Sequence, residues 1–501
     1  MLMLLRELIE KVDKKNVCAD MDLDMTGVES NSKAVRRGDL FVAVKGSVSD
    51  GHDFIKDAVK KGAACVVCER MPDVKIPYIL TDNSRKALAL ISAAWFKYPA
   101  RKMKLIGVTG TNGKTSVTHL IKHMIEKCSG SKVGLIGTIE NVIGERTLKS
   151  ELTTPDSYAM QSILDKMCFE GCDYAVMEVS SHALDLDRVY GIVYDVGVFT
   201  NLTPDHLDFH PTMDEYARVK SSLFTSCRSS IINIDDEYAH RMIERSGGDV
   251  MTYAVNDEAA SLVGRDIKVY SDKTEFYASL AGKTARVELC IPGMFSVYNA
   301  LAAMGAGIKL GFGADEIAAA LTSCKMVKGR AEILPIKRDY SVLVDYAHTP
   351  DALENIIKTA RSLTANRVIT LFGCGGDRDK AKRPLMGKIA SNLSDFVYIT
   401  SDNPRTEKPE AIIGDIVSGI ETGNTKKSGG NYCIVVDRKK AIFSALDSLQ
   451  TGDMLIIAGK GHETYQIIGT EKIKFDDREA VDDYYRQTKL NERLRQNIYN
   501  N

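Results

Sequence analysis

The residues best suited to chemistry lie in one glycine-rich turn, which follows an apolar run that begins at Lys104 and reads KLIGVTGTNGKTS. Backbone N–H groups can approach phosphate oxygens closely where side chains are small. In such a loop Lys114 would reach the β- and γ-phosphates of a nucleotide, and Thr115 would supply a hydroxyl for Mg²⁺. We therefore predict ATP or GTP binding by Gly110, Thr111, Asn112, Gly113, Lys114, Thr115 and Ser116.

The residues around the turn support this prediction. Val117, Leu120, Ile121 and Met124 recur at helical spacing behind the loop, so a strand, a loop and a helix follow one another as a phosphate site requires. One departure is Val108, which occupies the position of the first glycine in the general phosphate-loop pattern. The alternative, a glycine-rich turn that binds nothing, explains the lysine and threonine less well.

Other polar residues are concentrated where further strands are predicted to end. Ligands of open α/β sheets bind outside the carboxyl ends of the strands, so these segments are candidate site loops. They read MEVSSH at 177–182, TNLTPDHLD at 200–208, DYAHTP at 345–350, GCGGDRD at 373–379, DNPR at 402–405 and GKGHE at 459–463.

The elements that position these segments indicate an α/β protein of several domains. A chain of 501 residues corresponds to about three domains. We predict an N-terminal α/β domain over 1–100, a central phosphate-loop domain with a mostly parallel sheet over 101–329, and a Rossmann-like domain over 330–501. Within the last, strands are expected at 341–345, 367–372, 396–400 and 453–457.

Composition narrows the class of partner and the compartment. The net charge is −1, from 66 basic and 67 acidic residues, so no overall field attracts nucleic acid or an anionic membrane. No apolar run approaches the ~20 residues of a membrane span, and residues 1–12 read as an amphipathic helix rather than a signal peptide. The eleven cysteines favour a reducing compartment, with Cys65 and Cys68 as buried strand residues rather than half of a zinc site. We expect a cytoplasmic protein.

Taken together and in this order, the motifs resemble those of the Mur ligases, ATP-dependent enzymes that build the peptide of peptidoglycan precursors. The resemblance runs from GDLFVA at 38–43 to GKGHE at 459–463, and GTNGKT is the form of the phosphate loop that these ligases use, which accounts for Val108. It implies three domains, a monomer, and ATP and Mg²⁺ as cofactors. The implied partners are a UDP-MurNAc-dipeptide and meso-diaminopimelate.

Amide synthesis explains why such an enzyme needs ATP and cations. A carboxylate is not attacked by an amine at neutral pH until it is activated, here as an acyl phosphate, and the crowded negative oxygens must be neutralised. By resemblance, the catalytic residues are Lys114, Glu178, His206 and Lys220, and the metal-site residues are Thr115, Glu178, His206 and a carbamylated Lys220. Alone, Glu178 would read as a capped strand end, His206 as a surface histidine and Lys220 as a solvated helix lysine.

The resemblance also places the nucleotide and the nucleotide sugar. Contacts to adenine and ribose would come from Asn299, Arg330 and Asp345, so that the site is completed by domain closure. The nucleotide sugar would contact Ser30, Ser32, Ser47, Val48, Ser49, Thr153, Thr154, Ser180 and Arg188. The chain departs from the family pattern at Asn31 and Lys33, which replace Asp and Arg, and at Leu186, which is Gln in some relatives.

The segment DNPR discriminates among amino-acid substrates. Arg405 and Arg378 offer guanidinium groups for a carboxylate, whereas L-lysine would bring an ammonium toward them, so meso-diaminopimelate fits better. By resemblance its pocket comprises Arg378, Asp402, Asn403, Pro404, Arg405, Gly459 and Glu463. An ordinary turn after a strand is the alternative for DNPR.

Three other functions stay open at this point. The same ligation with L-lysine would keep the fold and change the pocket. A folate polyglutamate ligase shares the phosphate loop but has no reason to carry both DNPR and GKGHE. A nucleotide switch would hydrolyse slowly and without dependence on an amino acid.

Overall fold

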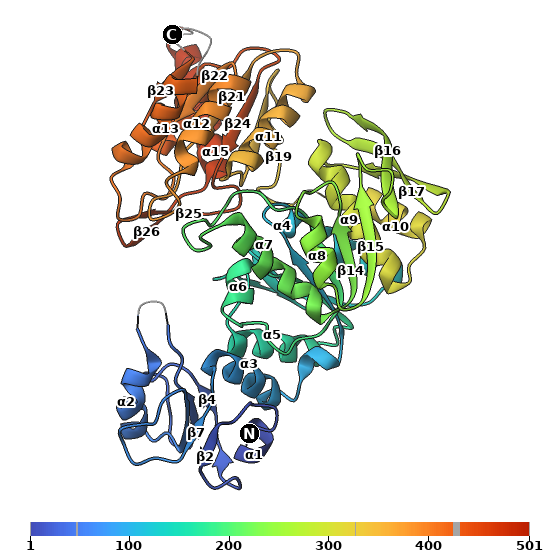
Figure 1. The fold of residues 1–501 in the computed structure, drawn as a ribbon. Helices are drawn as coiled ribbons and strands as arrows, with labels where there is room; N and C mark the ends of the chain where they lie inside the picture. The colour runs from blue at the N-terminus through green and yellow to red at the C-terminus, as the bar shows by residue number, and fades with distance from the viewer. Residues whose placement is uncertain (1, 47–48, 326, 424–430, 500–501) are drawn as a thin grey trace.

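The computed structural model describes residues 2–46, 49–325, 327–423 and 431–499. Three large sheets, of five, eleven and six strands, form three lobes that follow one another along the chain (Figure 1). The predicted α/β class with parallel sheets is therefore confirmed. Among the described residues no helix is long and apolar enough to cross a membrane.

The N-terminal lobe has a mostly parallel sheet. Its order is β2 (Asn16–Cys18), β7 (Tyr78–Leu80), β6 (Cys65–Cys68), β5 (Leu40–Val42) and β4 (Val28–Glu29), and only β2 runs antiparallel to its neighbour. Cys65 and Cys68 are both buried and belong to the apolar clusters on opposite faces of this sheet, which agrees with the prediction that they are core residues.

The helix predicted at the N-terminus is largely wrong. Met3–Leu4 is a short strand, β1, paired with β3 (Asp24–Met25), and the helix α1 covers only Leu5–Leu8. The apolar periodicity has a different origin: Leu5, Leu8, Ile9 and Val12 pack into the core of the lobe beside α3 (Ser84–Trp95).

The central lobe has an eleven-stranded sheet that is parallel in the middle and antiparallel at both ends. The parallel strands run in the order β9 (Val133–Ile136), β12 (Tyr174–Glu178), β8 (Lys104–Thr109), β13 (Tyr194–Phe199), β14 (Cys227–Asn233), β15 (Asp249–Ala254), β16 (Leu262–Val269). Antiparallel pairs flank them: β10 (Glu140–Ile143) with β11 (Arg146–Lys149), and β17 (Thr274–Leu280) with β18 (Lys283–Leu289).

Helices cover both faces of this sheet, because successive strand residues point to opposite sides. Ile106 and Val108 of β8 pack with α4 (Lys114–Ser129), α9 (Met294–Leu310) and α10 (Ala314–Thr322). Leu105 lies in the opposite cluster, with α5 (Ser157–Phe169) and α7 (Met213–Ser221). Because β8 lies inside the parallel part of the sheet, between β12 and β13, the loop that follows it opens beside the carboxyl ends of those two strands.

The C-terminal lobe is a second doubly wound sheet. Its order is β19 (Glu332–Ile333), β20 (Ser341–Asp345), β24 (Met454–Ala458), β21 (Val368–Phe372), β22 (Phe396–Ile399), β23 (Tyr432–Ile434), parallel except for β19. One face is covered by α11 (Pro350–Leu363), α12 (Lys382–Leu393) and α13 (Pro409–Gly423), the other by α14 (Arg438–Asp447) and α15 (Asp477–Tyr499). A hairpin of β25 (Tyr465–Ile468) and β26 (Glu471–Lys474) extends from its lower edge in Figure 1.

Candidate active site

The loop between β8 and α4 is held open by two glycines. Gly110 has φ +145° and Gly113 has φ +86°, which favour residues without a Cβ atom. A Cβ on Gly110 would lie only 1.9 Å from Oγ1 of Thr200. That hydroxyl donates to the carbonyl oxygen of Asn112 at 2.7 Å and so ties the loop to the end of β13.

Two lysines meet at this loop. The ammonium of Lys114 donates to the carbonyl oxygens of Gly110 at 2.9 Å and Thr111 at 2.8 Å. Lys220, which is only 1% exposed, donates to the same Gly110 oxygen at 2.7 Å and lies 4.7 Å from the centre of the Tyr216 ring. Burial lowers the pKa of both lysines, and the charge of Lys114 lowers the pKa of Lys220 further.

Glu178 stands beside the first turn of α4, at the end of the neighbouring strand β12. Its Oε1 accepts from Oγ1 of Thr115 at 3.0 Å and from the backbone N–H of Thr138 at 2.8 Å, and its Oε2 accepts from Oγ1 of Thr138 at 3.0 Å. The Thr138 hydroxyl also lies 3.0 Å from that of Thr153. A buried carboxylate and a hydroxyl in contact are hard oxygen donors of the kind that Mg²⁺ prefers.

The rest of the predicted metal set is arranged less compactly. Among the described residues no group of three or more His, Cys, Asp or Glu side chains could hold a metal ion by itself. His206 has φ +56° and a 39% exposed side chain, and its Nε2 lies 3.4 Å from Asp205. Partial desolvation lowers the pKa of His206 below its ordinary value, so its ring is neutral and able to act as a ligand at neutral pH. An ion here would also need oxygens from the nucleotide.

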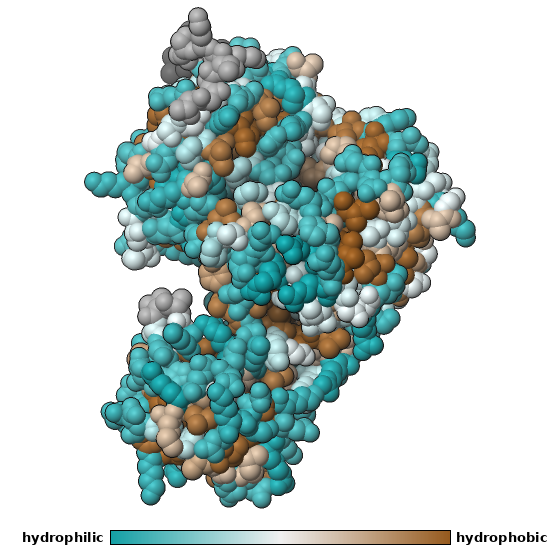
Figure 2. Space-filling view, viewed as in Figure 1, coloured by the Kyte–Doolittle hydropathy of each residue, from teal (hydrophilic) through white to brown (hydrophobic). Residues whose placement is uncertain are grey.

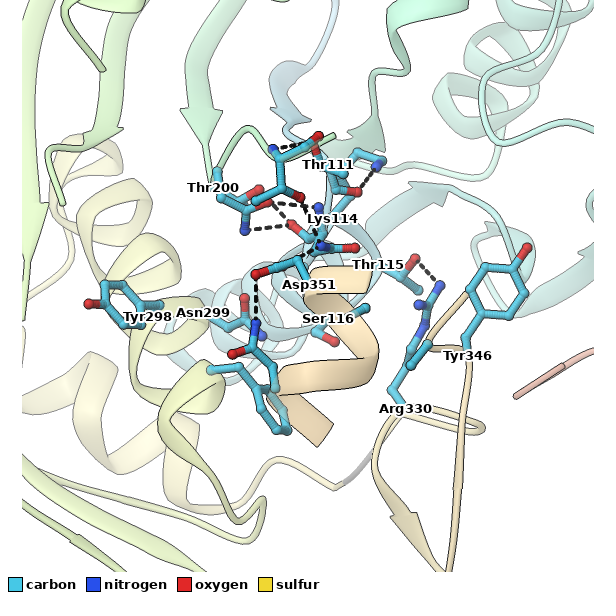
Figure 3. A pocket seen from close by; sticks show the side chains of 18 of the residues that line it. Thr111, Lys114, Thr115, Ser116, Thr200, Tyr298, Asn299, Arg330, Tyr346 and Asp351 are labelled. Atoms are coloured by element: carbon cyan, nitrogen blue, oxygen red, sulfur yellow. Dashed lines mark hydrogen bonds between the residues drawn. The ribbon is translucent and has the colours of Figure 1, made fainter. Parts of the chain in front are cut away.

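A cavity of about 500 Å³ lies between the central and C-terminal lobes and contains the loop (Figure 3). Arg330 reaches across it and donates to Oγ1 of Thr115 at 2.9 Å, with its guanidinium 4.6 Å from the centre of the Tyr346 ring. Asn112 donates to Asp351 at 2.8 Å, at the first turn of α11. The predicted cofactor residues that line this cavity are Thr111, Asn112, Gly113, Lys114, Thr115, Ser116, Asn299, Arg330 and Asp345.

Asp345 holds the backbone of the cavity wall that carries Arg330. Its carboxylate accepts from the backbone N–H groups of Ala331 at 2.6 Å and Ala347 at 2.7 Å, which fixes the chain next to Arg330. Burial raises the pKa of Asp345, while the charge of Arg330 opposes that rise. Figure 3 shows Asn299 and Tyr298 on the opposite side of the cavity from Arg330 and Tyr346, so the residues predicted to contact the cofactor come from both walls.

A second cavity, of about 580 Å³, lies between the N-terminal and central lobes. Figure 2 shows a deep indentation of the surface above the N-terminal lobe, which separates it from the C-terminal lobe. Of the residues predicted for the nucleotide sugar, Ser30, Ser32, Ser49 and Arg188 line it, together with the departing residues Asn31, Lys33 and Leu186. Ser47 and Val48 lie outside the described residues.

The other three residues predicted for the nucleotide sugar connect this cavity to the phosphate site. Thr153 contacts Thr138 beside Glu178, and Thr154 donates to the carbonyl oxygen of Glu178 at 2.8 Å. The hydroxyl oxygen of Thr154 accepts from the backbone N–H of Ser180 at 3.0 Å. The carbonyl oxygen of Thr154 accepts from Arg188, also at 3.0 Å.

The residues predicted for the amino acid form one cluster in the C-terminal lobe. Asn403 donates to Oε2 of Glu463 at 2.9 Å, and a Cβ on Gly459 would lie 2.7 Å from Oδ2 of Asp402. Nη1 of Arg405 donates to the carbonyl oxygen of Gly376 at 2.7 Å. A Cβ on Gly375 would contact both Arg405, at 3.0 Å, and Arg378, at 3.8 Å, so the two arginines border the same glycine.

Several site residues were not predicted from the sequence. Asp205 is buried and lies 3.6 Å from Lys382 and 3.9 Å from His348, both in the C-terminal lobe. Thr138 holds both oxygens of Glu178. Lys460 is fully buried between Asn403 and Glu463. Asp205, His348 and Lys460 stand inside motifs that the sequence analysis quoted, whereas nothing in the sequence marks Thr138 or Lys382.

Comparison with known proteins decides the family. Residues 24–97, 108–307 and 329–461 match, in that order, the Mur ligase family catalytic domain, the Mur ligase middle domain, and the Mur ligase glutamate ligase domain. This chain belongs to the Mur ligase family.

Individual Mur ligases resemble the chain over nearly its whole length. The UDP-N-acetylmuramoyl-L-alanyl-D-glutamate–2,6-diaminopimelate ligase 1 of Clostridium acetobutylicum is 45% identical over 97% of this chain and 100% of its own. The corresponding ligase of Clostridioides difficile is 44% identical over 96% and 99%. A solved structure of a ligase of that name is 30% identical, covers 97% of this chain and 99% of its own, and has a TM-score of 0.70.

Proposed function

We propose that this Mur ligase adds meso-diaminopimelate to UDP-MurNAc-L-Ala-D-Glu, with ATP activating the D-Glu carboxylate as an acyl phosphate. The observation that carries the proposal is the cluster in the C-terminal lobe, where Arg378 and Arg405 border Gly375 and Glu463 lies beside Asn403. The Arg405 guanidinium and the Glu463 carboxylate match the distal carboxylate and ammonium of diaminopimelate, and Arg378, whose Cγ borders the same glycine, would add a second guanidinium. The names of the full-length relatives support the same substrate.

Each lobe has a part in this proposal. Residues 1–100 would bind the nucleotide sugar through the cavity at Ser30, Ser32 and Arg188, residues 101–329 would bind ATP, and residues 330–501 would bind the amino acid. The contacts of Arg330 with Thr115 and of Asn112 with Asp351 join the last two lobes at the phosphate loop. Closure there would exclude water from the acyl phosphate.

Mg²⁺ fits the oxygen donors at the loop. Thr115 and Glu178 would hold it together with phosphate oxygens, with His206 and Lys220 nearby, and the ion would neutralise charge that builds up during phosphoryl transfer. Lys114 would leave the Gly110 and Thr111 carbonyl oxygens and turn toward the β- and γ-phosphates. Arg330 would contact the phosphates from the opposite wall of the cavity.

We propose that Lys220 becomes a carbamate. Burial lowers its pKa, which raises the share of the neutral amine, and a neutral amine is the form that reacts with CO₂. The product would replace a cation beside Lys114 with a carboxylate-like group, which suits a second metal ion and removes the repulsion between the two ammonium groups.

The compartment follows from the cysteines. All eleven are free in the structure, and most are at least partly buried, which suits a reducing environment such as the cytoplasm. We therefore place the reaction there, where ATP is also supplied.

The test of the function is phosphate release from Mg·ATP in the presence of UDP-MurNAc-L-Ala-D-Glu. Release that depends on meso-diaminopimelate supports the proposal. Release that depends on L-lysine instead would retain the ligase and change the amino acid, and release that no amino acid stimulates would favour a nucleotide switch.

A further inference from the structure

Lys460 is a fully buried lysine that the proposed mechanism does not use. It is the second residue after β24 and follows Gly459, which has φ +109°. Its side chain is 0% exposed, and its ammonium donates to Oδ1 of Asn403 at 3.0 Å and to Oε2 of Glu463 at 3.1 Å. A lysine so deeply buried is rare unless it is paired, so these contacts define its role.

The amide of Asn403 fixes the direction of this small network. Its Oδ1 accepts from Lys460 and from the backbone N–H of Ile467, both at 3.0 Å, while its Nδ2 donates to Oε2 of Glu463 at 2.9 Å. The reversed amide would place an NH₂ group against an ammonium and an oxygen against a carboxylate. Lys460 thus sets the orientation of Asn403 and, directly and through Asn403, the position of Glu463.

Some charged side chains of the cluster are paired with an opposite charge, and others are not. Lys460 neutralises Glu463, and Arg438 neutralises Asp477 through hydrogen bonds of 2.7 and 2.8 Å while lying 4.0 Å from Asp402. Asp402 shares Arg438 with Asp477 and is the less fully paired carboxylate of the cluster. Nη1 of Arg405 lies 3.0 Å from the place of a Cβ on Gly375. A distal ammonium would therefore meet a Glu463 carboxylate whose charge Lys460 already offsets, whereas a distal carboxylate would meet the Arg405 guanidinium.

We propose that Lys460 determines specificity by positioning and neutralising Glu463, so that the pocket selects its amino acid by the distal carboxylate and rejects one that carries only a distal ammonium. The inference rests on the proposed function, because it concerns the amino-acid site of that ligation. Lys460 acts through Glu463 and is a positioning residue. Rejection by an unpaired charge is an efficient way to discriminate between similar ligands.

The unmodified enzyme provides the first test. Three amino acids separate the two distal groups: meso-diaminopimelate carries both, L-2-aminopimelate carries the carboxylate alone, and L-lysine carries the ammonium alone. We expect kcat/KM to fall in that order, with L-2-aminopimelate at least roughly tenfold better than L-lysine. Equal use of the last two, or a preference for L-lysine, would overturn the proposal.

Variants of Lys460 provide the second test. Lys460→Gln keeps a hydrogen-bond donor but removes the charge, so the ratio of kcat/KM for L-2-aminopimelate to that for L-lysine should fall by roughly tenfold. Lys460→Arg keeps the charge and should keep most of the preference. Lys474→Gln is the matched control, because Lys474 pairs with Glu479 at a similar 3.0 Å but is 75% exposed.

The ratio separates specificity from stability. Both rates come from the same preparation, so a smaller folded fraction cancels, and an unchanged ratio in a folded Lys460→Gln enzyme would contradict the inference. If that variant does not fold, Lys460→Arg decides, because loss of the preference in a variant that keeps the charge would contradict the inference. Failure of the proposed function looks different, because the unmodified enzyme would then not respond to meso-diaminopimelate at all.

Discussion

Lys114 and Lys220 donate to the same oxygen, the carbonyl of Gly110, at 2.9 and 2.7 Å. Burial lowers the pKa of both lysines, and the nearby charge of Lys114 lowers the pKa of Lys220 further, because two ammonium groups this close repel each other. The arrangement is relieved if Lys114 moves to a phosphate or if Lys220 loses its positive charge. The proposed reaction requires both changes.

The first prediction concerns Lys220. Lys220→Ala should lower turnover by at least roughly a hundredfold, because it would remove the proposed carbamate ligand of the metal site. Adding acetate or another short carboxylate should restore part of the activity by supplying the missing oxygens. Phosphate release measures both effects. Arg218→Ala is the control on the same helix, since Arg218 is exposed and pairs only locally, with Glu215 at 2.6 Å. Full activity of Lys220→Ala would refute the assignment.

The second prediction concerns the metal requirement. Glu178→Gln keeps the shape of the side chain but removes the charge next to Thr115. The Mg²⁺ concentration that gives half-maximal activity should therefore rise by at least roughly tenfold. Thr115→Ser keeps the hydroxyl and should change this requirement much less. Titration of phosphate release with Mg²⁺ gives the value for each enzyme. An unchanged Mg²⁺ requirement in Glu178→Gln would rule out Glu178 as a ligand.

The third prediction separates the amino-acid site from the nucleotide site. Arg405→Ala should lower kcat/KM for meso-diaminopimelate by roughly a hundredfold, because it removes a charge-assisted hydrogen bond to a carboxylate. The KM for ATP should change little, since Arg405 lies in the C-terminal cluster around Gly375 and Gly376. Arg361→Ala, at an exposed pair with Asp395, is the control in the same lobe. Equal losses for both substrates would contradict the pocket.

The fourth prediction concerns stability at acid pH. Burial lowers the pKa of His348 to about 4 and of His462 to about 3. The unfolded chain protonates its histidines near pH 6.5, so between that pH and about 4 it binds protons that the folded enzyme does not. The contribution of these two histidines to stability should therefore be constant above about pH 7 and fall as the pH decreases from 6.5 toward 4.

Thermal unfolding between pH 4 and 8 tests this prediction. The Tm of the enzyme should fall by several degrees over the acid range, and His462→Asn should make the fall shallower. His240→Asn, at an exposed histidine, should leave the slope unchanged. A Tm that did not depend on pH between 6.5 and 4 would show that these histidines are not buried in neutral form.

The parallel sheets and the strand-end loops follow from sequence patterns. Apolar runs such as 341–345 and 453–457 appear as β20 and β24 with bounds shifted by at most one residue, because buried parallel strands are continuously hydrophobic. The N-terminal segment was mistaken for a longer helix because Leu5, Leu8, Ile9 and Val12 have helical spacing, although α1 ends at Leu8 and the last two pack from the turn that follows.

Contacts between lobes could not be predicted in the same way. The position of Asp205 between His348 and Lys382 depends on how two separately folded sheets meet, and no local pattern encodes that distance. Thr138 is similar, because it reaches Glu178 from a different strand connection and is an ordinary threonine by sequence. Motifs identified the residues that carry charge, and the structure identified the neighbours that orient them.

The central claim is the ligation itself, and one measurement tests it most directly. The purified enzyme is given Mg·ATP and UDP-MurNAc-L-Ala-D-Glu, and phosphate release is compared with meso-diaminopimelate, with L-lysine and with neither. We expect strong release and formation of the tripeptide product with meso-diaminopimelate alone. Release with L-lysine that matches or exceeds it, or release that no amino acid changes, would contradict the account.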